Sequence, residues 1–111
     1  MQEAKAITKF VRVQPRKARL SADLIRGLSV SDAMLQLRFG QSKGAKLLLK
    51  TLNSAVANAE TQQDVRREDL IVLEVRVDEG PRYKRIKPKN RGGRHPIQKK
   101  TSHLTVVVGV E

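Results

Sequence analysis

The chain has 111 residues and carries 23 Lys and Arg against 11 Asp and Glu, so its formal net charge is +12 and its isoelectric point is about 10.8. The many positive side chains repel one another in a folded protein, and an anionic partner relieves that repulsion. Nucleic acid is the first candidate for this partner, and an anionic membrane surface is the second. The length suits one domain.

The composition also excludes several classes of protein. There is no cysteine, which excludes a disulfide scaffold and a cysteine-ligated zinc site and suits a reducing compartment. No apolar run approaches the roughly 20 residues that a membrane span needs, and residues 1–10 lack the apolar core of a secretory signal. We therefore expect a soluble cytoplasmic protein.

The chain is predicted to begin with a strand at residues 4–13, followed by a helix. A strand would place Ala4, Ala6, Thr8 and Phe10 on one face and Lys5, Ile7, Lys9 and Val11 on the other. Pro15 favours the first position of a helix, and Gly27 suits its C-terminal cap. The stripe between them consists of Ala18, Ala22 and Ile25, flanked by Ser21 and Leu24.

Two further helices are predicted after the first. One lies at residues 29–40, with Ser29 or Ser31 as its N-cap and Gly40 at its end. The strongest amphipathic pattern follows at residues 43–60. Its apolar stripe consists of Ala45, Leu48, Leu49, Leu52, Ala55, Val56 and Ala59.

Two strands are predicted in the remainder of the body, at residues 70–77 and 103–110, after a polar connection at 61–70. The first would place Ile71, Leu73, Val75 and Val77 on one face, with Glu74 and Arg76 opposite; the second would align Leu104, Val106, Val108 and Val110. The sequence therefore predicts an α+β fold in which three helices pack on a small three-stranded antiparallel sheet.

A cationic arm separates these two strands. Residues 80–103 contain nine Lys or Arg and no carboxylate. We expect residues 80–100 to form a long β-hairpin that protrudes by about 40 Å from a body of residues 1–79 and 101–111. Its turn lies at residues 89–94, "KNRGGR", where Asn and Gly tolerate positive φ.

Lys and Arg spaced along such a ribbon match a phosphate-lined channel. The arm's predicted nucleic-acid contacts are Arg82, Lys84, Arg85, Lys87, Lys89, Arg91, Arg94, Lys99 and Lys100. A helix disfavours cations in its first turns, so the cations of "PRKAR" indicate an anion at that position. The body's predicted contacts are Arg12, Arg16, Lys17, Arg19, Lys43, Lys50, Asn53 and Asn58.

No motif supports an enzyme or a metal site. The sequence has no nucleophile–base pair, no G-x-G-x-x-G and no Walker loop, so we expect neither catalysis nor a cofactor. His95 and His103 lack cysteine or carboxylate neighbours that would complete a metal site. His103 either contacts RNA or caps the start of the last strand. The aromatic residues Phe10, Phe39 and Tyr83 are too few for a sheet that stacks several bases.

Two other classes of protein compete with an RNA-binding structural protein. One is a free-standing basic architectural protein that reaches nucleic acid with a β-ribbon. The other is a basic protein of membrane surfaces, which is disfavoured because the helix at 43–60 has the Ala- and Leu-rich stripe of a core helix.

Four stretches closely resemble the family of ribosomal protein twenty-two of the bacterial large subunit. They are "VQPRKARLSADLIRG", "KTLNSAVANAE", "VDEGPRYKRIKPKNRGGR" and "KKTSHLTVVV", in this order and over nearly the whole chain. One departure is Gln14, which stands where the family usually has Ser or Thr. We therefore expect the first helix to lack a side-chain cap worth about 1 kcal/mol.

The resemblance implies a large-subunit rRNA-binding protein that supports subunit assembly, with its body at the ribosome surface near the polypeptide exit. It implies that the hairpin passes through the rRNA and that its tip lines the exit tunnel, near ribosomal protein four and the nascent polypeptide. The implied tip residues are Lys89, Asn90, Arg91, Gly92, Gly93 and Arg94. The predicted contacts of arm and body, with His103, are then contacts to rRNA.

Overall fold

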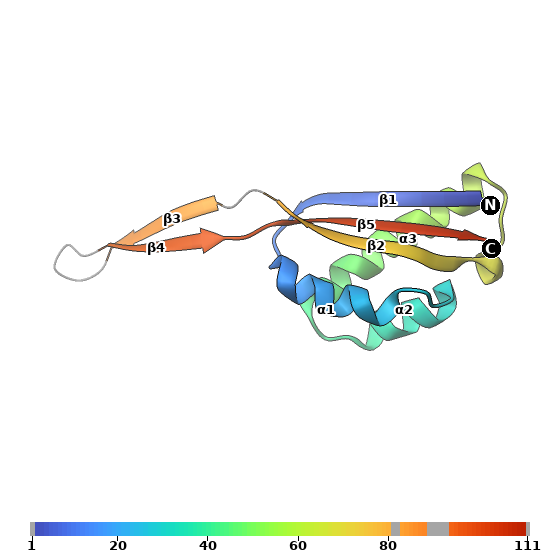
Figure 1. Ribbon diagram of the computed structural model, residues 1–111, viewed down its shortest axis with the longest axis horizontal. Helices are drawn as coiled ribbons and strands as arrows, with labels where there is room; N and C mark the ends of the chain where they lie inside the picture. Colours follow the sequence, from blue (N-terminus) through green and yellow to red (C-terminus); the bar gives the residue numbers. More distant parts are fainter. Residues whose placement is uncertain (1, 81–82, 89–93, 111) are drawn as a thin grey trace.

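A three-stranded sheet, helices on one of its faces and a two-stranded ribbon make up the protein (Figure 1). The computed structural model describes residues 2–80, 83–88 and 94–110, and it describes side chains for residues 3–80 and 100–110. In chain order the elements are β1 (Gln2–Val11), α1 (Pro15–Ile25), α2 (Val30–Phe39), α3 (Lys43–Gln62), a short 3₁₀ helix (Arg67–Asp69), β2 (Ile71–Glu79), β3 (Tyr83–Pro88), β4 (Arg94–Lys99) and β5 (Ser102–Val110).

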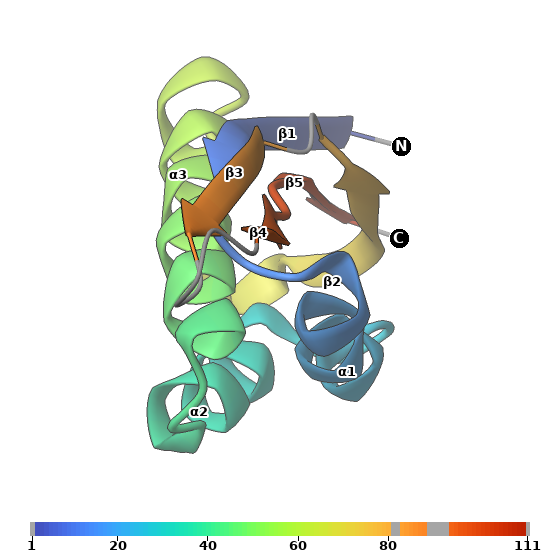
Figure 2. The ribbon, with the colours of Figure 1, turned by 90° about the vertical axis from the view of Figure 1, so that its left-hand side faces the viewer.

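The last strand of the chain is the central strand of the main sheet. The strand order is β1-β5-β2, and β5 pairs antiparallel with both neighbours. α3 packs against β1 and β5, while α1 packs against β2. α2 packs on α1 and α3, so the helices cover a single face of the sheet (Figure 2). This arrangement confirms the predicted α+β fold.

Serine and glycine set the ends of the second and third helices. Ser29 caps α2, since its Oγ accepts a hydrogen bond from the Asp32 amide at 3.3 Å, and the amide of Gly40 closes the helix onto the Gln36 carbonyl at 3.1 Å. Ser42 caps α3 in the same way. The prediction for α1 was one residue too long. Arg26 is the cap residue there, and Gly27 follows it with a φ of 80°.

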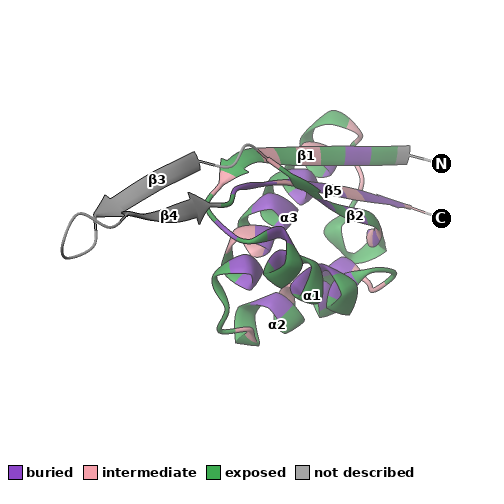
Figure 3. Ribbon diagram, turned by 60° about the vertical axis from the view of Figure 1, so that its left-hand side comes forward, coloured by how far each residue is buried: buried purple, intermediate pink, exposed green. Residues whose placement is uncertain are grey.

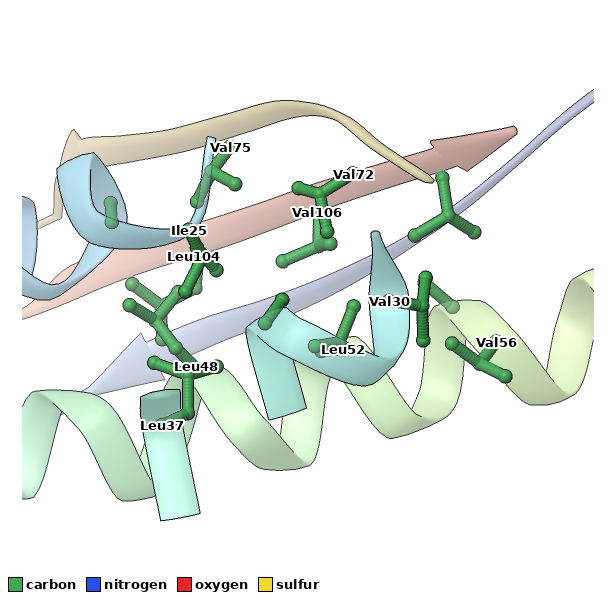
Figure 4. Close-up of a cluster of buried hydrophobic side chains, with 14 of the residues drawn as sticks. Ile25, Val30, Leu37, Leu48, Leu52, Val56, Val72, Val75, Leu104 and Val106 are labelled. Carbon is green, nitrogen blue, oxygen red and sulfur yellow. The ribbon is translucent and has the colours of Figure 1, made fainter. Parts of the chain in front are cut away.

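The core lies between the helices and the covered face of the sheet (Figures 3 and 4). The predicted stripes of α1 and α3 are buried apart from Leu49, which is half-buried, and the flanking Leu24, which is exposed. Val110, predicted on the inner face of β5, is only half-buried because it lies at the end of the strand. The other predicted residues of that face are fully buried and meet the helices from the sheet: Leu104, Val106 and Val108.

The predicted inner face of β2 was wrong in its first half. Val72 is fully buried, whereas Ile71 and Leu73 are half-buried. Val72 pairs with Val108 and Glu74 pairs with Val107, so Leu73 is an extra residue in β2. Such a bulge exchanges the two faces of a strand. Only beyond it does the predicted alternation hold, with Val75 and Val77 buried.

β1 also departs from its predicted alternation near its end. Ala4 is buried, and Ala6 and Thr8 are half-buried, as one face of the strand should be. The pairing with β5 then shifts between Thr8 and Val11, and Phe10 adopts a φ of 60°. Phe10 consequently leaves the face of Ala4 and is 55% exposed. The strand ends at Val11, two residues earlier than predicted.

Side chains in α1 and α3, or directly after these helices, cap the backbone on both edges of the sheet. On β1, the Asn58 amide donates to the Lys5 carbonyl at 3.1 Å, and Gln63 donates to the Glu3 carbonyl. On β2, Arg19 donates to the Val77 carbonyl at 3.1 Å, and Arg26 donates to the Val75 carbonyl at 2.8 Å. Unpaired edge groups invite pairing with another chain, so these bonds protect the sheet.

The arm is a second, two-stranded antiparallel sheet of β3 and β4. Tyr83 pairs with Lys99 and Pro88 pairs with Arg94, which is the register of a ribbon whose strands are joined through residues 89–93. Those joining residues lie outside the described part of the chain. The ribbon extends away from the body and makes the molecule 62 Å long (Figure 1).

Gln14 offers a direct test of the missing cap on α1. It has the extended backbone of an N-cap, with φ −68° and ψ 130°, but makes no side-chain cap hydrogen bond. Gln14→Ser should therefore raise the free energy of unfolding by about 0.5–1 kcal/mol, measured by denaturant titration. Ser29→Ala is the control and should lower it by a similar amount. If only the control changes stability, the cap is not what α1 lacks.

The body should fold without the arm. Every buried hydrophobic side chain among the described residues belongs to residues 4–77 or 104–108. Replacing residues 82–98 by an Asn-Gly turn should leave the helical circular dichroism and the midpoint of thermal unfolding nearly unchanged. Loss of cooperative unfolding would show instead that the arm belongs to the core.

Candidate nucleic-acid interface

Two helices begin side by side at the end of the body from which the arm leaves (Figure 1). A Cβ atom built on Gly44 of α3 would lie 3.2 Å from the Cα of Ala18 on α1, so the two backbones touch at this point. The hydroxyls of Ser21 and Ser42 are 3.3 Å apart. Glycine, alanine and serine thus allow the first turn of α3 to lie directly beside the first turns of α1.

Both of these helix starts carry cations and neither carries an acid. Arg16 and Lys17 are exposed in the first turn of α1, and Lys43 and Lys46 are exposed at the start of α3. α2 begins at the opposite end of the body (Figure 1), and its first turn contains Asp32. The helix dipole favours an acid at every N-terminus. The two helix starts beside the arm therefore carry charges that slightly destabilise their helices but would attract a bound anion.

The root of the arm brings more cations to the same place. Ser102, the first residue of β5, pairs with Val11 and donates a hydrogen bond from its buried Oγ to the Val13 carbonyl at 2.7 Å. This ties the returning strand of the arm to the segment that precedes α1. The exposed Arg12 and Lys100 flank this joint. We call the six exposed cations Arg12, Arg16, Lys17, Lys43, Lys46 and Lys100 the cationic end.

Close packing fixes where the arm joins the body. The Gly80 amide donates to the Thr101 carbonyl at 2.9 Å, and a Cβ atom at Gly80 would lie 2.5 Å from the Thr101 Oγ1. His103 Nδ1 accepts a hydrogen bond from the Phe10 amide at 3.1 Å, and the two rings meet edge to face. His103 therefore has a partner within the protein at the start of β5, and its contact with RNA stays a prediction.

Two other predicted contacts also have partners within the protein. Arg19 directs Nε and Nη2 to the Val77 carbonyl, and Asn58 directs its amide to the Lys5 carbonyl. Both side chains therefore satisfy backbone carbonyls on the edge strands of the sheet. Contact with RNA through their remaining donors stays a prediction.

The outer face of α3 extends the cationic end along the helix. Lys50 and Asn53 are exposed, as predicted. Lys46, which was not among the predicted contacts, lies one turn from Lys43 and one turn from Lys50 on this face. Its spacing in the sequence could have identified it.

The predicted contacts of the arm between Arg82 and Lys99 lie outside the part of the chain whose side chains are described. For β3 and β4 the structure gives the backbone alone. The strands place residues 83–88 opposite residues 94–99, so the cations within these two strands belong to one narrow ribbon. Asp78 and Glu79 are the acids at its root, on β2.

The rest of the surface carries mixed charge. The hollow over the open face of the sheet is lined by Glu3, Lys5, Glu74 and Arg76, and the last two form an ion pair at 3.3 Å. At the end opposite the arm, Glu60 pairs with Arg67 at 3.2 Å. Within residues 2–80, 83–88 and 94–110, no group of three His, Asp or Glu is placed to bind a metal. No helix in this part of the chain could cross a membrane.

Comparison with known proteins places the chain in a family. The family profile described as "Ribosomal protein L22p/L17e" matches residues 6–109. A relative from Protochlamydia amoebophila, named "Large ribosomal subunit protein uL22", is 71% identical over 108 residues, covering 97% of each chain. A relative of the same name from Chlamydia felis is 62% identical over 105 residues, covering 95% of each chain.

These matches confirm the resemblance drawn from the four sequence stretches. They also confirm that the protein is not an enzyme, because members of this family are structural components. The chain belongs to the ribosomal protein L22p/L17e family.

Proposed function

We propose that the protein is a structural constituent of the large ribosomal subunit in the bacterial cytoplasm, and that it binds large-subunit rRNA with its cationic end and its arm. The observation that carries this proposal is the meeting of two acid-free helix starts with the root of a cationic ribbon. The close relatives are large-subunit proteins by name, which supplies the identity of the RNA.

The chemistry of this surface suits a phosphate backbone. The amides in the first turns of α1 and α3 have no carbonyl partner within the helix. They lie beside the exposed cations, so amides and cations can attract the same anion. The Arg12 and Arg16 guanidinium groups can bind phosphate in a bidentate manner, and the lysines add point charges. The release of counterions from RNA then supplies much of the affinity.

The arm is proposed to pass between rRNA segments, with its tip at residues 89–94 lining the polypeptide exit tunnel. Its predicted protein neighbour is ribosomal protein four, and the nascent polypeptide would pass the tip. The family membership supports this role. The structure supports it through a ribbon that is held by paired strands of the body at both ends.

A free-standing architectural protein with a basic ribbon remains the alternative function. Sedimentation separates the two, because a ribosomal constituent stays with large subunits in moderate salt. Recovery of the protein with free nucleic acid alone would favour the alternative.

Charge reversal at the cationic end tests the RNA-binding role. Arg16→Glu with Lys17→Glu should weaken binding to an in vitro transcript of bacterial large-subunit rRNA. The slope of log affinity against log salt should fall by roughly 0.7–0.9 for each phosphate that the variant no longer neutralises.

Arg66→Glu is the matched control, because Arg66 is an exposed cation at the opposite end of the body. This variant should retain the salt slope of the wild type. An unchanged slope in the Arg16/Lys17 variant would show that these two residues are solvated surface cations that do not contact the RNA.

Deleting the tip tests the tunnel role. Removal of residues 90–93 should leave the stoichiometry of the protein in purified large subunits almost unchanged, because the body supplies most of the docking surface. Stalling on a tunnel-sensitive peptide should change in a translation assay with these subunits. If incorporation is abolished instead, the tip is an assembly anchor.

A further inference from the structure

We propose that Phe39 is a stacking platform for one unpaired base of RNA, beside the cationic end. This inference rests on the proposed RNA-binding function and adds a side chain that binds a base rather than a phosphate. It concerns a single aromatic side chain, so it differs from the multi-aromatic sheets that the composition excludes.

The exposure of Phe39 is the first argument. Phe39 is 79% exposed, the largest value among the large hydrophobic residues whose side chains the structure describes. Burying a phenylalanine side chain stabilises a protein, and Phe39 forgoes most of that stabilisation. Phe10, the other phenylalanine, has the edge-to-face contact with His103. The fold therefore does not account for an aromatic ring at position 39.

The location of Phe39 is the second argument. It is the last residue of α2, and a Cβ atom built on the next residue, Gly40, would lie 2.9 Å from the Ala45 Cβ on α3. The end of α2 is thus held against the first turn of α3. Figure 1 shows the α2–α3 connection running back toward the end of the body that bears the arm. Phe39 therefore lies next to the cationic end.

The surrounding charge is the third argument. No Asp or Glu occurs between Asp32 and Glu60, and Arg38, Lys43 and Lys46 within this stretch are exposed. A protein site that binds a nucleotide combines a flat apolar surface, on which the base stacks, with cations that bind the phosphate. An apolar protein partner would gain nothing from this concentration of positive charge. The charge favours RNA as the occupant.

A second exposed apolar residue makes the hypothesis testable. Leu35 is 50% exposed and lies one turn before Phe39, so both residues share the outer face of α2. A protein docked on this face would contact Leu35 and Phe39 alike. A stacked base requires the ring and can do without Leu35.

The experiment measures the affinity of Phe39→Ala, Phe39→Leu and Leu35→Ala for the in vitro transcript of large-subunit rRNA at several salt concentrations. Both Phe39 variants should bind roughly 5- to 150-fold more weakly, as expected when one base can no longer stack, with an unchanged salt slope. Leu35→Ala should bind like the wild type. The unfolding midpoint should change little in all three, because both positions are exposed.

A fluorescence measurement tests the stacking itself. The chain contains no Trp, so Phe39→Trp introduces one tryptophan, which can be excited separately from Tyr83. This variant should keep the wild-type affinity, and RNA should quench its emission. Leu35→Trp is the control, and its emission should change little.

Two results would overturn the proposal. Phe39→Leu binding as tightly as the wild type would show that no ring is needed. Leu35→Ala weakening assembly into large subunits as much as Phe39→Ala, with RNA affinity unchanged in both, would assign this face to a protein neighbour. Failure of the proposed function itself looks different, because wild-type binding would then be independent of salt and of Arg16 and Lys17.

Discussion

The pairing of β2 with β5 holds the body together and fixes where the arm leaves it. These strands are neighbours in the main sheet, yet the whole arm separates them in the chain. Glu79 pairs with Ser102, so the chain leaves the body and returns to it at adjacent positions. The pairing of β2 with β5 in the body therefore fixes the root of the ribbon in one place. The bonds of Gly80 to Thr101 and of Ser102 to Val13 then join this root to the segment before α1.

The alternating direction of the helices distributes the charge. α1 and α3 begin at the arm end and α2 begins at the other, so only two of the three helix starts face the same way as the arm. These two lack acids, and the third has Asp32. The small residues Ala18 and Gly44 allow the two starts to touch. The close approach of α1 to α3 therefore both packs the core and brings together the two helix starts of the candidate anion-binding surface.

Sequence patterns predicted which residues are buried wherever the spacing of apolar residues stayed regular along a helix or strand. The stripes of α1 and α3 and the alternation of β5 needed only helix or strand geometry, so their burial was largely predicted correctly. The bulge at Leu73 and the shift at Phe10 could not be predicted, because they depend on the register with β5. Such a register is a tertiary property and has no local signal in either strand.

The candidate site was predictable in its charges but not in its internal partners. Residue type and position were enough to select Arg16, Lys17 and Lys43. Arg19 and Asn58 look equally available in the sequence, yet the structure directs them to backbone carbonyls of the two edge strands. Only the fold shows that an edge strand lies within reach of a given helix side chain. The same holds for Phe39, whose nearness to α3 follows from the close approach of Gly40 to Ala45.

Hydrogen exchange of the protein, free and bound to the large-subunit rRNA transcript, can show whether the two helix starts and the arm form one RNA-binding surface. If they do, binding should slow the exchange of residues 12–19, 38–46 and 80–103. Residues 60–70, at the opposite end of the body, should exchange equally fast in both states. Protection at residues 60–70, with none at the starts of α1 and α3, would show that RNA binds a different surface.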